Sequence, residues 1–297
     1  MRILVVSYYF FPATNPRAYR WTKVVEQFSK LGHQVDVVTS GPRNLTKSQV
    51  QDGVTIYRTG STFRDWVSKI TKTTPKQRNK IKDVPGGKPL IPAEKILRFI
   101  YEITWRKIYW PDHSCLWMYK GYRKSITQIK RRRYDALITV SPEFSSHLIG
   151  LGCKHRFPSL RWVVDFGDPF SIMRDTPANN LTFYENLNYR VERRVLSGAD
   201  AISLTNEVVS KIYLETFKDC VKEKISIIPP IGMRTPIERR PLENRKRKIV
   251  VAYFGMLYKN IREPDGLLQL FRDMQRLDDN LHELLQLHFF CGDISAC

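Results

Sequence analysis

The sequence predicts a doubly wound α/β domain built on a parallel sheet, followed by the start of a second domain of the same kind. Short continuous apolar runs, typical of strands buried on both faces, alternate with segments whose apolar residues recur at helical spacing. The 297 residues are 42% hydrophobic and 26% charged, which are ordinary values for a globular chain. No apolar run approaches the ~20 residues that a membrane-spanning helix needs. A proline-containing stretch after residue 230 separates two blocks of this alternation.

The first forty residues predict one β–α–β unit. The apolar run 3–6 is typical of a buried strand. Asn15 and Pro16 then indicate a helix start, because asparagine caps helices well and proline fits the first helical position. Apolar residues continue at helical spacing until Gly32, which ends the helix, and residues 35–39 predict the next strand.

The same alternation extends along the rest of the chain. Further strands are predicted at 54–57, 136–140, 162–165, 201–204 and 225–228, and helices at 93–108, 116–131, 144–153, 184–196 and 208–217. We therefore assign 1–230 to one Rossmann-like domain and 231–248 to a linker. Residues 249–297 predict the start of a second Rossmann-like domain, with strands at 249–254 and 285–290 around a helix at 264–277. Because two strands and one helix bury too little apolar surface, we expect this second domain to be incomplete.

The positive charge is concentrated in one segment. The chain has 49 Lys and Arg against 29 Asp and Glu, a net charge of +20, and 19 of these basic residues lie between Arg64 and Arg133 with five acidic ones. This segment, 61–133, reads as an insertion that contains a long polar loop and two helices, with Trp and Tyr among the basic residues. Such a composition suits an anionic membrane surface or a nucleic acid, and an ordinary solvated surface is the alternative.

Several classes of site and compartment are disfavoured by the sequence. The five cysteines are scattered without a C-x-x-C pair, and the histidines have no metal-ligand spacing, so we expect no disulfide framework and no metal. The loop 7–15 after the first strand contains no glycine, which argues against a dinucleotide cofactor. The N-terminus lacks a small-residue cleavage site and reads as a buried strand, so we expect a cytoplasmic protein.

The first candidate site lies where the first predicted helix begins. In open parallel sheets ligands bind at the carboxyl ends of the strands, so the loops that follow the strands are where sites are expected. Asn15, Arg17 and Arg20 stand at the start of that helix. Free amides, the positive end of the helix dipole and two guanidinium groups together form a site for phosphate or carboxylate. The alternative is that both arginines are solvated helix residues.

Two later loops carry the other candidates. Ser141 and Glu143 follow the strand at 136–140, where they either cap the next helix or bind substrate hydroxyls. Asp165 and Asp168 follow the strand at 162–165, and Asp168 is suited to accept hydrogen bonds from sugar hydroxyls or to act as a base. The alternative is a turn, since Gly-Asp-Pro is a turn-forming sequence.

Taken in order, these segments resemble the N-terminal half of GT-B glycosyltransferases, in particular the retaining family 4 of bacterial surface-polysaccharide type. Residues 1–12 and 31–40 look like that family's first β–α–β unit, and 162–170 is similar to its acceptor-domain D-F-R-D-P-W stretch, with Gly167 in place of the usual Arg. Residues 198–202 and 227–232 resemble the family's A-D and I-P-N-G signatures, and 253–255 resembles the start of the donor domain.

The resemblance implies transfer of a sugar from a nucleotide-sugar donor to an acceptor, with no metal or other cofactor required. It places the acceptor on the N-terminal domain, facing Asn15, Arg17, Arg20, Ser141, Glu143, Asp165 and Asp168, with Asp168 as the catalytic candidate. It places the donor diphosphate near Gly255, Lys259 and Arg262, although Met256 occupies the first phosphate-binding position. The family's E-x7-E segment would lie beyond Cys297, so we expect the donor domain to be truncated and this chain not to turn over alone.

Three functional hypotheses follow. The first is a glycosyltransferase that acts on a lipid-linked or saccharide acceptor, peripheral at the inner face of the cytoplasmic membrane, with the segment 61–133 docked on anionic lipid. The second is a non-catalytic acceptor-binding or scaffold module, completed by a partner chain that supplies the donor half. The third is a nucleic-acid-binding protein, which only the charge supports. We favour the first and expect no nucleic-acid partner.

Overall fold

The computed structural model describes residues 1–41, 45–60, 104–231, 249–255, 257, 263–277 and 285–290. The chain divides into two compact units, Met1–Gly232 and Met233–Cys297. The predicted α/β class with a mostly parallel sheet is confirmed.

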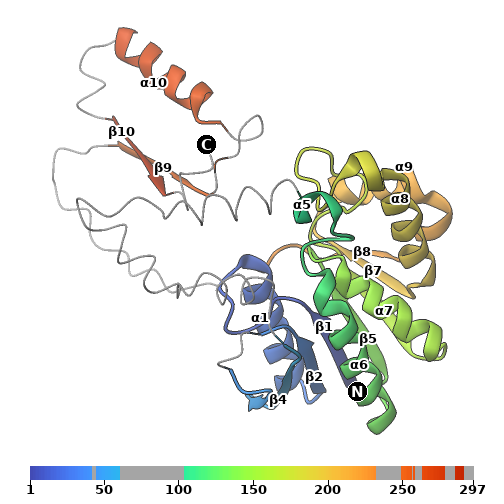
Figure 1. Cartoon of the computed structure of the whole chain (residues 1–297). Coiled ribbons are helices and arrows are strands. Elements are labelled where there is room, and N and C mark those ends of the chain that lie inside the picture. Colours follow the sequence, from blue (N-terminus) through green and yellow to red (C-terminus); the bar gives the residue numbers. More distant parts are fainter. Residues whose placement is uncertain are drawn as a thin grey trace. The chain divides into compact units, whose positions relative to one another are not determined.

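An eight-stranded sheet forms the centre of the first unit (Figure 1). Its strands, in chain order, are β1 (Arg2–Ser7), β2 (Gln34–Thr39), β3 (Ser48–Gln51), β4 (Val54–Arg58), β5 (Ala136–Val140), β6 (Arg161–Asp165), β7 (Ala201–Leu204) and β8 (Ile225–Ile227). They are arranged in the order β3-β4-β2-β1-β5-β6-β7-β8, and every neighbouring pair is parallel except β3 with β4. The chain moves from β1 outward through β2 and later returns to β5, so the direction of winding reverses between β1 and β5.

Helices cover both faces of this sheet. They are α1 (Pro16–Lys30), α6 (Cys115–Arg131), α7 (Ser145–Arg156), α8 (Leu181–Gly198) and α9 (Glu207–Val221), while the short helix α5 (Trp105–Ile108) precedes α6 in the chain. One face packs against Trp21 and Val25 of α1, and the other packs against side chains of α6, α7, α8 and α9. Along β1, Ile3 and Val5 join the first of these clusters and Leu4 and Val6 the second. A strand buried on both faces explains why β1 is apolar without interruption.

Most predicted boundaries lie within a few residues of the observed ones, and β5 and β7 match exactly. The apolar pattern did not predict β3, a short edge strand with a single apolar residue, Val50. It pairs with β4 through Asp52 and Gly53, whose φ angles are 50° and 77°. An Asp-Gly pair in that conformation is a hairpin signal, and it marks the strand better than hydrophobicity does. Of the helix predicted at 93–108, residues 105–108 are helical as α5, and 93–103 lie outside the described residues.

The described residues of the second unit form a parallel strand pair and a helix. β9 (Ile249–Phe254) and β10 (Leu285–Phe290) pair in parallel with Ile249 opposite Leu285, and α10 (Asp265–Leu277) lies between them in sequence. Both strands have the predicted bounds. The predicted linker from 232 onward, and the part of the basic segment at 61–103, lie outside the described residues. Within the described parts of the chain, no helix is both long enough and apolar enough to cross a membrane.

Candidate functional site

The carboxyl ends of β1, β5 and β6 lie side by side in the sheet, on both sides of the point where the winding reverses. Crevices at such reversal points are where open parallel sheets bind ligands. The ends of these three strands, the loops that follow them and the first turns of α1 hold all the residues that the sequence predicts for the acceptor. We therefore describe this edge of the sheet as the candidate site.

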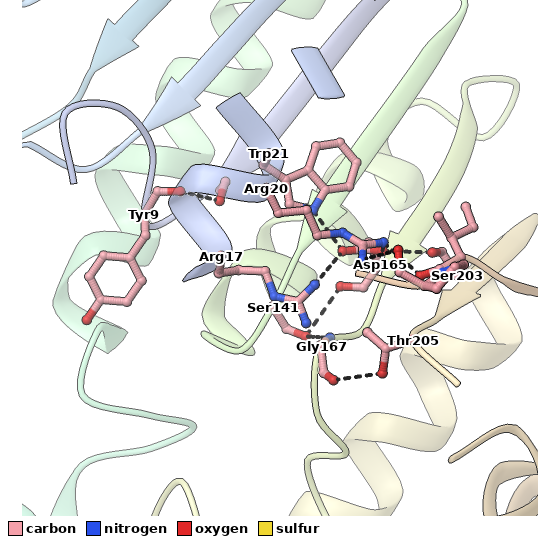
Figure 2. A network of polar contacts seen from close by, with 12 residues as sticks. Tyr9, Arg17, Arg20, Trp21, Ser141, Asp165, Gly167, Ser203 and Thr205 are labelled. Atoms are coloured by element: carbon pink, nitrogen blue, oxygen red, sulfur yellow. Dashed lines mark hydrogen bonds and ion pairs between the residues drawn. The ribbon is translucent and has the colours of Figure 1, made fainter. Parts of the chain in front are cut away.

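Asp165, the last residue of β6, is the centre of a buried polar network (Figure 2). The residue is 1% exposed. Its Oδ2 accepts hydrogen bonds from Arg17 Nη1 at 3.2 Å and Trp21 Nε1 at 2.8 Å. Its Oδ1 accepts one from Ser203 Oγ at 2.7 Å and lies 3.7 Å from Arg20 Nη2. Asp165 therefore joins α1 to β6 and β7 and lies beneath the site surface.

Arg20 is directed into the protein. It is 6% exposed, and besides its ion pair with Asp165 it donates to the Pro229 carbonyl oxygen at 2.9 Å and the Ile228 carbonyl oxygen at 3.0 Å. These contacts tie α1 to the chain that follows β8. Basic residues near a helix N-terminus oppose the helix dipole, and a nearby negative charge offsets this cost. Within the folded protein, Asp165 supplies that charge.

Arg17 lies over Gly167, and the contact depends on glycine. A Cβ atom at residue 167 would lie 1.4 Å from Arg17 Nη2, so any larger residue would displace the guanidinium group. The Gly167 amide donates to Ser141 Oγ at 3.2 Å, and that hydroxyl donates to the Asp165 carbonyl oxygen at 3.3 Å (Figure 2). Burial lowers the pKa of Arg17, while the Asp165 carboxylate opposes this effect. The loops after β5 and β6 and the start of α1 are thus held in one arrangement.

Asn15 and Asp168 are the remaining candidates in the loops after β1 and β6, and they have different surroundings. The Asn15 side chain accepts the Ala18 amide at 2.8 Å, so it caps α1 as the sequence predicts. Asp168 is exposed, three residues beyond Asp165, and stands at the rim of a cavity. The roles predicted for these residues toward an acceptor stay predictions.

That cavity has a volume of about 220 Å³ and opens beside the loops after β5 and β6. Its polar lining consists of Asp112, His113, Glu143, Asp168 and Thr176. Its apolar lining consists of Pro142, Pro169, Phe170, Met173 and Ala178. The cavity is smaller than the roughly 300–1,000 Å³ of sites for drug-sized ligands, so it suits one small group.

Asp112 forms the buried base of the polar wall. Its Oδ1 accepts the Ser114 amide at 2.8 Å, Ser114 Oγ at 2.5 Å and Ser145 Oγ at 2.8 Å, and its Oδ2 accepts the Ser145 amide at 2.7 Å. Four donors therefore engage both oxygens of this carboxyl group. Asp112 was not among the predicted site residues, although Asp-x-Ser is a local turn signal that marks it.

Glu143 lies next to Asp112 and is 8% exposed. Burial, together with the charge of the neighbouring Asp112 carboxylate, raises the pKa of Glu143 well above its ordinary value. Glu143 Oε2 is 3.4 Å from His113 Nδ1, and His113 Nε2 is 3.2 Å from the Tyr9 hydroxyl. Burial lowers the pKa of His113, and Asp112 opposes that effect. The group therefore combines one carboxylate with a neutral carboxylic acid and a neutral imidazole.

The loop that carries Asp168 is fixed from below by Glu192 of α8. This carboxyl group is fully buried and accepts the Ser171 amide at 2.8 Å, the Phe170 amide at 3.3 Å and the Tyr213 hydroxyl at 2.6 Å. Ser171 Oγ donates to it as well. Glu192 holds the cavity wall in place, and local sequence gives no signal for this role because its partners come from two other segments.

The predicted donor-phosphate residues belong to the second unit. Gly255 directly follows β9 with a φ of 153°, a conformation that favours glycine. Lys259 and Arg262 lie outside the described residues, so their predicted role is not tested.

Comparison with known proteins shows similarity to solved structures. No protein-family model and no curated protein matches this sequence. Among solved structures, sucrose-phosphate synthase from Thermosynechococcus elongatus superposes with a TM-score of 0.53 at 13% identity, over 96% of this chain and 69% of that one. α,α-Trehalose-6-phosphate synthase from Burkholderia multivorans gives 0.50 at 11% identity, over 98% and 64%. The N-terminal domain of trehalose-6-phosphate phosphatase from Candida albicans gives 0.50 at 14% identity, over 97% and 64%.

These similarities identify the fold class. The chain has the Rossmann-like fold of GT-B glycosyltransferases, which confirms the predicted class. It spans about two thirds of the length of the structures that it resembles. Membership of family 4 and the surface-polysaccharide type are not tested by these similarities and stay predictions.

Proposed function

We propose that this protein is a glycosyltransferase that transfers a sugar from a nucleotide-sugar donor to an acceptor bound by the first unit. The observation that carries the proposal is the cavity of about 220 Å³ at the reversal point of a GT-B-type sheet, with the exposed carboxylate of Asp168 at its rim. Asp168 is the group that we assign to accept the proton of the acceptor hydroxyl. We propose that the transfer requires no metal, and that Gly255, Lys259 and Arg262 contact the donor diphosphate.

The proposal is tested by incubating the full chain with UDP-, GDP-, ADP- and dTDP-sugars and a panel of saccharide and lipid-linked acceptors, and measuring released nucleotide and glycosylated product. A transferase gives product with at least one pair. Binding of an acceptor without turnover, in the presence of every donor, would instead support the acceptor-binding or scaffold module that a partner chain completes.

The role of Asp168 gives a sharper test of the same reaction. Asp168→Asn keeps the shape of the side chain and removes its ability to take a proton, so kcat should fall by about 10²-fold or more. Asp175→Asn is the matched control, because Asp175 is an exposed carboxylate of the same loop that does not line the cavity. Equal activities of the two variants would exclude Asp168 as the base.

We further propose that the acceptor is lipid-linked and belongs to surface-polysaccharide synthesis, with the protein bound at the membrane's inner face. The exposed side of α6 supports this proposal. Its exposed side chains recur at helical spacing and combine basic with apolar character: Leu116, Tyr119, Lys120, Arg123, Lys130 and Arg131. A basic helix face with aromatic and aliphatic residues is suited to bind an anionic lipid surface.

A further inference from the structure

We propose that the cavity between the loops after β5 and β6 binds a neutral hydroxyl-bearing group, one sugar ring of the acceptor, and rejects anionic groups. This inference rests on the proposed function and names the kind of acceptor moiety that this part of the site takes. It runs against the net charge of +20, which by itself favours phosphate.

The first observation behind the proposal is the negative charge of the cavity wall. Asp112 and Asp168 are carboxylates, and among the described residues that line the cavity none is Lys or Arg. The guanidinium group of Arg17 lies in the adjoining hollow and is directed to Asp165 at 3.2 Å. A phosphate or carboxylate in the cavity would therefore meet the like charges of Asp112 and Asp168, and the described lining residues offer no cation to offset them.

The second observation is that the surroundings of Glu143 favour its neutral form. Glu143 is 8% exposed and lines the cavity together with Asp112, so burial and the neighbouring Asp112 carboxylate both favour its neutral form. Asp112 already receives four hydrogen bonds from Ser114 and Ser145, whereas Glu143 has no such set of donors among the described residues. In its neutral form Glu143 adds no second charge to the buried wall.

The third observation is that the cavity has polar groups on one side and apolar surface on the other. Carboxyl and imidazole groups on one side can exchange hydrogen bonds with hydroxyls, while Pro169, Phe170 and Met173 provide apolar surface for the C–H faces of a ring. Glu192 fixes the loop that bears these apolar residues through the Phe170 and Ser171 amides. A site that pairs fixed polar groups with apolar surface suits a polyol better than a purely apolar or an ionic ligand.

The first experiment compares ligand classes. Binding of neutral methyl glycosides, a hexose 1-phosphate and a hexuronate to the full chain is measured by saturation-transfer NMR and titration calorimetry at pH 7. We expect at least one methyl glycoside to bind at least tenfold more tightly than the charged sugars. Ala178→Phe fills the cavity and should abolish that binding, whereas Asp175→Asn should leave it unchanged. Binding of the charged sugars with equal or higher affinity, no glycoside binding, or glycoside binding that survives Ala178→Phe would overturn the proposal.

The second experiment uses pH as the variable. The groups that face Glu143 are Asp112 and His113 before α6, Arg17 of α1, Asp168 after β6 and Tyr9 after β1. As pH rises, Glu143 loses its proton beside Asp112, and glycoside affinity should fall by about tenfold. Glu143→Gln stays neutral, so its affinity should match that of the wild type at pH 6 and lack the alkaline loss. The same alkaline loss in both proteins would contradict the assignment of Glu143.

These outcomes separate the inference from the function on which it rests. Glycoside binding with the expected pH profile, but no sugar transfer from any donor, would leave the cavity assignment in place and remove the transferase proposal. Sugar transfer without glycoside binding in the cavity would remove the cavity assignment and leave the transferase proposal in place.

Discussion

At the scale of single residues, the position of the Arg17 side chain depends on glycine at residue 167. The guanidinium group occupies the space where a side chain at 167 would begin, because a Cβ there would lie 1.4 Å from Nη2. Gly167→Ala must displace Arg17 from Asp165, so we expect the free energy of unfolding to fall by about 1–3 kcal/mol. Denaturant unfolding of the purified protein measures this change.

A double-mutant cycle provides the control for this prediction. In Arg17→Ala the space above residue 167 is empty, so adding Gly167→Ala to that background should cost little. The two substitutions should therefore be non-additive by at least about 0.5 kcal/mol, as expected for residues in direct contact. Additive effects would contradict the proposed steric dependence between them.

Glu143 makes the stability of the protein depend on pH. Its pKa in the folded state is raised by burial and by Asp112, so the folded protein holds this proton more tightly than the unfolded chain. Its contribution to folding is therefore fully present below the ordinary pKa of glutamate and is lost as pH rises toward the folded value. We expect Glu143→Gln to gain stability relative to the wild type as pH increases from 4 to 8.

Thermal unfolding of both proteins across that pH range measures the difference. Asp175→Asn serves as the comparison, since it removes an exposed carboxylate from a nearby loop and should follow the wild-type curve. A constant difference between Glu143→Gln and the wild type at all pH values would show that folding does not raise the pKa of Glu143.

At the scale of elements, α1 is the helix that carries the arginines of the site. Asn15 caps it through the Ala18 amide, and the helix then presents Arg17, Arg20 and Trp21 to Asp165. Asn15→Ala should cost about 1 kcal/mol in the free energy of unfolding, since the amide is left without its acceptor. Asn15→Ser should restore most of the loss, because serine is an equally good cap. Denaturant unfolding of the wild type and the two variants measures these free energies. Equal losses of stability in both variants would assign Asn15 a role other than capping.

The elements themselves were predictable because each depends on its own residues. Alternation of buried apolar runs with helical spacing located β1, β5 and β7, and the Asn15-Pro16 pair located the start of α1. β3 was missed because its stability comes from pairing with β4 across a two-residue turn and not from an apolar pattern.

At the scale of the whole molecule, the excess of positive charge predicts a salt-dependent membrane interaction. Lys120, Arg123, Lys130 and Arg131 lie exposed on α6. Each basic side chain near an anionic bilayer contributes roughly 1 kcal/mol. Replacing all four by alanine should weaken binding to vesicles that contain anionic phospholipid by roughly a hundredfold or more, as measured by co-sedimentation at low salt.

The matched control removes the same number of charges elsewhere. Lys30 of α1 and Lys211, Lys218 and Lys222 at α9 are exposed and lie outside the α6 face. Their replacement by alanine should weaken vesicle binding much less. Equal losses in the two quadruple variants would mean that net charge, and not the α6 face, governs the interaction. Wild-type binding to DNA at the same salt without binding to vesicles would contradict the membrane proposal.

The sequence by itself determined the fold class and the loops in which the site lies, because strand burial, helix caps and turn residues are local properties. Only the tertiary structure decided what the residues in those loops do. Asp165 and Arg20 face each other beneath the site, while Asp112 and Glu143 form its acidic wall. Such pairings join segments far apart in the chain, and whether a charged side chain meets a counter-ion, another carboxyl group or solvent depends on how those segments pack.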